Sequence, residues 1–396
     1  MDFPKSVTIE ACESFLHKIN SDRENEALLL PVDSSRYAFG GLSSAIQVIN
    51  TWARKNNDRA LLLRSSRSKD VIAELIQSPH KFSAAMSAKS IGIKGGPSDI
   101  KARVYSAAKS AIESQPMNQF GQQRGGLCWF AFVDHSSKGF DRNFYLAKPN
   151  AKPEPRQPEQ FTAVISSMVR KAMSVVGGAK EIDQDSLDCL GRTFYELFLN
   201  THEHGTRGAS RSEWLMPGVR IIYVQAIRMI DEGAKNATEG QPNLREYLAA
   251  VSEKVPENGN KRFVEIGIVD SGLGYCDRWL SDRPSAEING PVAAFEEYQI
   301  FKKCFSFRQT SSSKGNKGNG LPVVMDRLTK LGGFMRVRSG HLALYRDFVS
   351  SPYRANDDAC VFSDWNSSQS AENSITSMEK TSGVAISLLL PLEAKL

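Results

Sequence analysis

Three polar residues in one short segment have the types and the spacing for metal and phosphate chemistry. Glu196, Asn200 and His204 fall four residues apart in YELFLNTHEHG. Four residues turn an α-helix by about 400°, so the three side chains drift by only about 40° per step and share one face. An amide oxygen suits Mg²⁺, and a carboxylate one turn away can polarise a water. A solvated helix face has the same pattern, so this segment alone leaves both interpretations open.

A second segment carries an aspartate followed by two glycines. IVDSGLGY places Asp270 at the end of an apolar run, with Gly272 and Gly274 just beyond it. A carboxylate accepts a hydrogen bond from an exocyclic amine, and glycines let a flat ring approach the backbone. The segment is therefore suited to hold a ring that carries an amino group.

A third segment is rich in glycine. In SSSKGNKGNGLPVV, Gly315, Gly318 and Gly320 precede a helix expected to start near Leu321, and Lys314 adds positive charge. Such a loop can point backbone N–H groups at phosphate, helped by the positive end of the helix. Flexible loops are often rich in Gly and Ser, so the order of the three segments is more informative than this one alone.

Taken in order, the segments resemble the ATP-binding domain shared by gyrase-type ATPases, Hsp90, MutL and histidine kinases, the GHKL family. ELFLN is similar to its N box, DSGLG to its DxGxG box and GNKGNGL to its GxG-L box, while TSGVAISLLLPL resembles its closing strand. The resemblance covers roughly residues 160–396. It implies a Bergerat-type α/β sandwich, in which a mixed sheet carries helices on one face.

The resemblance also implies roles for individual residues. Asn200 would hold the Mg²⁺ that bridges the phosphates of ATP, and Asp270 would bind the adenine amino group beside Gly272 and Gly274. Glu196 occupies the position of the base that orients water in hydrolysing members, although serine-kinase members carry Glu there as well. The other expected nucleotide contacts are His204, Lys314, Gly315, Gly318, Gly320 and Leu321.

Two departures from the family pattern matter for function. Many sensor kinases carry Lys three residues after the Asn, whereas this chain has the acidic Glu203, and the N-x-x-x-H-G pattern is closer to the branch that contains anti-sigma-factor serine kinases. The closing box has Gly383-Val384 where Gly-Thr is usual, so a hydroxyl contact is lost or moved. His17, His80 and His135 lack the context of a phosphoacceptor histidine.

The leading interpretation is an ATP-binding regulatory protein that hydrolyses Mg-ATP to switch an interaction with a protein partner. A protein serine kinase of anti-sigma type and a non-catalytic, nucleotide-gated binding module are the alternatives. The partner is not identified by the sequence, and a homodimer stays open.

The elements that must position these residues fall into two expected domains. A proline-rich stretch at residues 148–160 separates an N-terminal α/β domain, residues 1–147, from the ATP-binding domain, residues 161–396. Near the N-terminus, EALLLPV and RALLLRS flank a helical segment, GGLSSAIQVINTWARKNN, which predicts a β-α-β unit with parallel strands. This part also looks slightly like a STAS domain. GLCWFAFVDH and RNFYLA are expected to form a closing strand pair.

After the proline-rich stretch, periodicity predicts further elements. The helices are FTAVISSMVRKAMSVVG, DSLDCLGRTFYELFLNTHEHG and GLPVVMDRLTKLGG. The strands are RIIYVQAIRMI, RFVEIGIVD, FMRVRSG, HLALYRD and GVAISLLLPL. Residues 356–380, rich in Ser and Asn, are expected to form a hairpin tip or insertion.

Composition excludes several classes. The chain of 396 residues has no apolar run of about 18 residues and no signal-peptide pattern at its start. Its six cysteines form no CxxC pair, which favours reduced thiols in the cytoplasm over a zinc site. The net charge of +6 is too small to favour nucleic acid as a partner.

Overall fold

The fold is organised around one large antiparallel sheet. The computed structural model describes residues 1–21, 26–37, 39–66, 69–115, 126–147, 153–175, 182–229, 238, 240–253, 261–283, 292–306, 320–354 and 361–391. The strand order of the sheet is β13-β12-β11-β14-β10-β9-β6, and every pairing in it is antiparallel. The strands are β6 (Leu127–Val133), β9 (Val219–Met229), β10 (Lys261–Val269), β11 (Phe334–Gly340), β12 (Leu342–Asp347), β13 (Ser363–Asp364) and β14 (Thr381–Pro391).

Alternating side chains in these strands build two separate cores. Along β9, Ile222 and Val224 join one core, whereas Ile221 and Tyr223 join the core on the opposite face. The period of two in RIIYVQAIRMI predicts this alternation. Both faces are apolar, so both must be covered.

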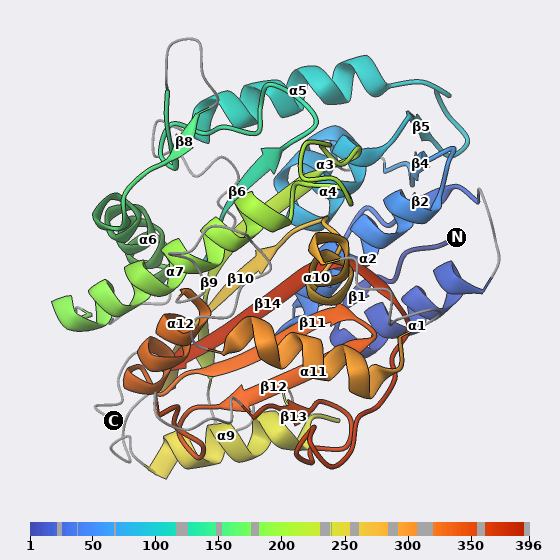
Figure 1. Ribbon diagram of the computed structural model, residues 1–396. Coiled ribbons are helices and arrows are strands. Elements are labelled where there is room, and N and C mark those ends of the chain that lie inside the picture. The colour runs from blue at the N-terminus through green and yellow to red at the C-terminus, as the bar shows by residue number, and fades with distance from the viewer. Residues whose placement is uncertain are drawn as a thin grey trace.

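Helices cover both faces of the sheet. The first face packs against α6 (Pro158–Met173), α7 (Gln184–His204), α11 (Ala294–Phe305) and α12 (Gly320–Lys330). The second packs against α1 (Ile9–Asn20), α2 (Gly41–Lys55), α4 (Pro79–Ser87) and α9 (Pro242–Glu253). Figure 1 shows α7, α11 and α12 on the near side of the red strand β14, with α1 and α2 behind it. The sequence predicted a mixed sheet with helices on one face. The large sheet is instead antiparallel, and helices cover both of its faces.

The N-terminal part contains a small parallel sheet. Strand β4 (Ala60–Leu63) pairs with β2 (Leu28–Leu30) on one side and β5 (Ser90–Ile93) on the other. The predicted β-α-β unit of β2, α2 and β4 is confirmed, and the chain is an α/β protein. The likeness to a STAS domain stays a prediction. The helices α3 (Val71–Gln77) and α5 (Lys101–Ser114) and the short strands β1 (Ser6–Val7) and β3 (Ser35–Tyr37) complete this part.

The large sheet crosses the boundary expected at residues 148–160. Strand β6 precedes that boundary, yet it pairs with β9 over its whole length, from Leu127 with Gln225 to Val133 with Val219. The expected partner of β6, the RNFYLA segment, instead forms β7 (Tyr145–Leu146) and pairs with β8 (Glu154–Pro155). The end of the proline-rich stretch is therefore structured, and Pro158 starts α6, where a missing N–H costs no helical hydrogen bond.

Two further elements differ from the sequence-based expectation. Residues 361–380 carry β13, and Phe362, Trp365 and Ala371 are buried, so this part of the expected hairpin tip packs on the molecule. Helix α10 (Tyr275–Asp282) follows the Asp-Gly segment directly. Among the described residues, no helix has both the length and the apolar character of a membrane span.

Candidate functional site

Asp270 lies one residue beyond the end of β10, in a buried loop between the sheet and the helices. Its Oδ1 accepts hydrogen bonds from the backbone N–H groups of Gly272, at 2.8 Å, and of Val384, at 3.2 Å. Within the described part of the chain, its second oxygen, Oδ2, accepts no hydrogen bond. Oδ2 is not among the fully buried atoms, so it can accept a hydrogen bond from solvent or from a ligand.

Glycines close the space around this carboxylate. A Cβ on Gly205 would lie 2.6 Å from Cγ of Asp270, and a Cβ on Gly272 would lie 2.7 Å from Cα of Gly205. Gly383 has φ +72° and would place a Cβ 2.1 Å from the carbonyl oxygen of Asp270. Only glycine fits at these positions, so three backbone segments meet at Asp270: the end of α7, the 270–272 loop and the start of β14.

Burial controls the charge of Asp270. Burial raises the pKa of its carboxyl to about 6, while the N–H donors of Gly272 and Val384 lower it. The carboxylate is therefore the main form at neutral pH, poised close to protonation.

Asn200 lies on α7, five residues before Gly205. Its side-chain Nδ2 is buried and donates to none of the described residues. A 180° rotation of the amide would place Oδ1, an oxygen ligand suited to Mg²⁺, at the same position. An orphaned buried amide of this kind fits a metal or phosphate ligand better than it fits a closed core.

Glu196 lies one turn earlier on α7 and faces the start of α12. A Cβ on Gly320 would lie 2.6 Å from Oε2 of Glu196. The other oxygen, Oε1, pairs with Nη2 of Arg192 at 2.6 Å. Burial raises the pKa of Glu196, Arg192 lowers it and Glu203 raises it further, and the net direction is upward. A carboxyl group whose pKa is shifted upward is a stronger base once it ionises.

His204, the third residue of the face predicted on α7, contacts Arg211. Its Nδ1 lies 3.4 Å from Nη2 of Arg211, which also pairs with Asp282 at 2.5 Å. Desolvation and the charge of Arg211 lower the pKa of His204 to about 4. The imidazole is thus neutral and serves as an acceptor for Arg211 on the surface beside α10.

The remaining expected contacts divide into two groups. Gly274 has φ +87° and begins α10 against Oγ of Ser339, and Leu321 is buried in the core behind Gly320. Lys314, Gly315 and Gly318 lie outside the described residues. The segment expected to be the closing box contacts Asp270 through the backbone N–H of Val384, at 3.2 Å.

Helix α2 supports the site from the opposite face of the sheet, which sequence reasoning missed. Asn50 Nδ2 donates to the carbonyl of Asp270 at 3.3 Å, and Arg54 donates to the carbonyl of Ser271 through Nε at 3.2 Å and Nη2 at 2.8 Å. Gln47 Nε2 reaches the carbonyl of Gly383 at 3.3 Å, and Thr51 Oγ1 accepts from the N–H of Ser382 at 2.9 Å. The signal in the sequence is that Gln47, Asn50, Thr51 and Arg54 recur at helical spacing between the apolar residues of this segment.

Searches for related proteins give no further guide to the chemistry. No family model, curated protein or solved structure matches this chain. The function must therefore be argued from the geometry of the site itself.

Proposed function

We propose that this chain binds Mg-ATP between α7, the 270–272 loop and the start of α12, and hydrolyses it to switch an interaction with a protein partner. The observation that carries the proposal is the carboxylate of Asp270, whose Oδ2 accepts no hydrogen bond from the described residues, while Gly205 and Gly383 lie against the residue. An adenine amino group would supply the missing donor.

The arrangement around Asp270 favours a GHKL-type site over an unrelated polar cluster. The three sequence segments that resemble that family contact one another, because Gly205 at the end of α7 meets Asp270, and Gly320 at the start of α12 meets Glu196 on α7. The contacting residues are 65 positions apart for Gly205 and Asp270 and 124 apart for Glu196 and Gly320, so these contacts do not follow from closeness in the sequence. Helices α6, α7 and α12 cover one face of the sheet, as the family fold would require, whereas the antiparallel pairing and the helices on the second face depart from it.

Each residue then has a distinct task. Asp270 selects the base, and the glycines beside it let the ring lie close to the backbone. Asn200 would hold Mg²⁺, whose charge would offset that of the phosphates. Glu196 would orient and deprotonate the attacking water, and the upward shift of its pKa makes its carboxylate a stronger base. The first turn of α12, which begins at Gly320, would point backbone N–H groups at phosphate oxygens.

The test compares phosphate release by the wild type, Glu196→Gln and Asn200→Ala at saturating Mg-ATP. We expect both variants to lose about two orders of magnitude in turnover, Glu196→Gln with ATP affinity kept and Asn200→Ala with Mg²⁺ dependence shifted. If ³²P from the γ-phosphate appears on protein rather than as free phosphate, the serine-kinase alternative replaces hydrolysis. If the wild type binds ATP without turnover of either kind, the chain is a nucleotide-gated binding module.

A further inference from the structure

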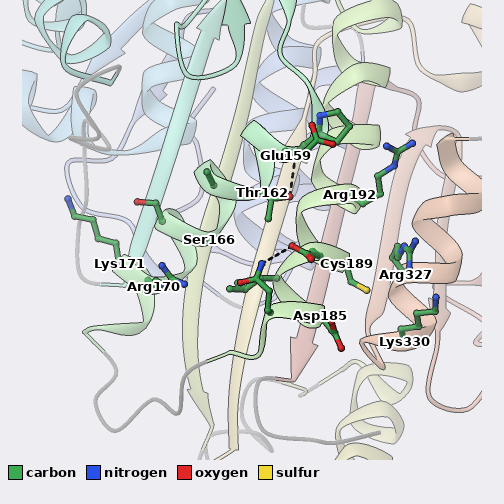
Figure 2. Close-up of a pocket in the computed structure, with 16 residues that line it drawn as sticks. Glu159, Thr162, Ser166, Arg170, Lys171, Asp185, Cys189, Arg192, Arg327 and Lys330 are labelled. Carbon is green, nitrogen blue, oxygen red and sulfur yellow. Dashed lines mark hydrogen bonds between the residues drawn. The ribbon is translucent and has the colours of Figure 1, made fainter.

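A polar groove runs along the outer side of α7, between α6 and α12. Its volume is about 1280 Å³. In Figure 2, residues of α6 line one wall, α7 forms the floor and α12 forms the other wall. Asp270 does not line this groove, although α7 contributes residues to both places.

Positive side chains stand on both walls and on the floor of this groove. Arg170 and Lys171 come from α6, Arg192 from α7, and Arg327 and Lys330 from α12. Three carboxylates also line it, those of Glu159, Asp185 and Asp188. Two of the cations share one carboxylate, because Lys330 Nζ lies 3.2 Å and Arg327 Nη1 lies 3.8 Å from Oδ2 of Asp326. The cations outnumber the carboxylates of the groove, which favours an acidic ligand.

One groove cation also contacts the candidate catalytic base. Arg192 pairs with Glu196 at 2.6 Å, and the Arg192 side chain is 41% exposed while that of Glu196 is 11% exposed. The guanidinium can therefore turn toward a ligand in the groove, whereas the carboxylate stays in place. While the pair is closed, Glu196 is held by a cation and is less available to take a proton from water.

We propose that the groove binds an acidic peptide segment of a partner protein, and that a carboxylate of this segment draws Arg192 away from Glu196 and so activates ATP hydrolysis. The activation step rests on the function proposed above, but the binding step does not. On this proposal, the partner that regulates hydrolysis carries an acidic peptide segment.

The mixed lining favours a peptide over a nucleic acid. A phosphate backbone presents negative charge at every step and would meet Glu159, Asp185 and Asp188 along the groove. A peptide can place its few carboxylates at the cations and its neutral or donor groups at these acids.

The binding step is tested without nucleotide, by the fluorescence anisotropy of a labelled hexaglutamate peptide. The variant Arg327→Gln/Lys330→Gln should bind it about five- to ten-fold more weakly than the wild type, as expected for two exposed ionic contacts. The matched control, Lys18→Gln/Lys109→Gln, removes two exposed cations from α1 and α5 and should bind as the wild type does. An equal loss in both variants, or tighter binding of an oligothymidylate, overturns the proposal.

The link to Glu196 is tested by three further measurements. Glu196→Gln frees Arg192, so it should bind hexaglutamate several-fold more tightly, and Arg192→Met should bind it more weakly. With Mg-ATP, hexaglutamate should raise phosphate release in the wild type, and Arg192→Met should show raised release that the peptide no longer changes. Unchanged peptide affinity in Glu196→Gln, or lower release in Arg192→Met, contradicts the link. If the wild type releases no phosphate, the proposed hydrolysis is refuted. The hexaglutamate affinities of Glu196→Gln and Arg192→Met still test whether the groove binds an acidic peptide.

Discussion

At the scale of single residues, Asp270 makes the proposed site dependent on pH. Burial raises the pKa of Asp270 to about 6, and the protonated carboxyl no longer accepts through both oxygens. Adenosine is the suitable ligand because it carries no phosphate that titrates. Its affinity should be constant above pH 7 and should fall below pH 6, by at most about ten-fold per pH unit. Calorimetric titrations between pH 5 and 8 measure this. Asp270→Asn should bind weakly with a flat profile, and a flat profile in the wild type would count against the assignment of adenine to Asp270.

Glu265 provides a second pH prediction, about stability rather than binding. It is buried between the sheet and α2, where Oε1 accepts from Tyr223 Oη at 2.6 Å and from the N–H of Gly40 at 3.1 Å. Burial raises the pKa of Glu265 from 4.5 to about 7, so the protonated form is favoured in the fold. The stability that this group contributes is complete below about pH 4.5 and is lost as the pH rises to about 7, a difference of about 3 kcal/mol.

Glu265→Gln should remove this dependence, because the amide stays neutral. Urea unfolding at pH 5 and pH 8 should show the variant gaining stability relative to the wild type at the higher pH. Glu246→Gln, an exposed carboxylate on α9, is the control and should leave the pH dependence unchanged. A wild type equally stable at both pH values would mean that Glu265 keeps an ordinary pKa.

At the scale of elements, α2 is the support of the 270–272 loop. Arg54 makes two hydrogen bonds to the carbonyl of Ser271. Arg54→Met keeps the length of the side chain but leaves this carbonyl without its donor, so the loop loses its preferred position. ATP affinity should fall about ten-fold, the cost of one lost charged hydrogen bond, while turnover at saturation stays unchanged. Arg103→Met, an exposed cation on α5, is the control, and a fall in turnover with normal affinity would contradict a positioning role.

Local sequence patterns predicted most of the helices and strands, but few of the pairings between strands. The strand β9 and the helix α7 were both predicted from local patterns: β9 sends alternate side chains into two cores, and α7 buries one apolar stripe. Helix α9 was missed, although Leu244, Tyr247, Leu248 and Val251 repeat at helical spacing and are all buried. The pairing of β6 with β9 joins residues more than 80 positions apart, and nothing local in either strand specifies it.

The same distinction applies to the site. Glu196, Asn200 and Asp270 could be proposed from the sequence because each lies in a short motif, and their roles stay predictions. The α2 residues that hold the loop were missed because Asn50 and Arg54 bond only to backbone carbonyls, which have no signature in the sequence. Arg192 could have been found, since an arginine four residues before a glutamate on a helix predicts an ion pair.

At the scale of the whole molecule, the N-terminal part is expected to be needed for folding. A fragment of residues 153–396 lacks β6 and the helices that cover Ile221, Tyr223 and Val269 on the second face of the sheet. Exposure of an apolar sheet face and an unpaired edge should leave this fragment aggregated or without cooperative unfolding. Co-expression with residues 1–147 should restore a soluble complex. Cooperative thermal unfolding of the isolated fragment would instead show two independent domains.

Selection of the base tests the central claim most directly. Calorimetric titration of the whole chain with Mg-ATP and with Mg-GTP, at neutral pH and millimolar nucleotide, compares an amino group with a carbonyl at the ring position that Asp270 would bind. We predict that Mg-ATP binds, that Mg-GTP does not, and that Asp270→Asn loses the preference, because the amide can donate to the guanine carbonyl. Equal binding of both nucleotides by the wild type, or binding of neither, would contradict the account.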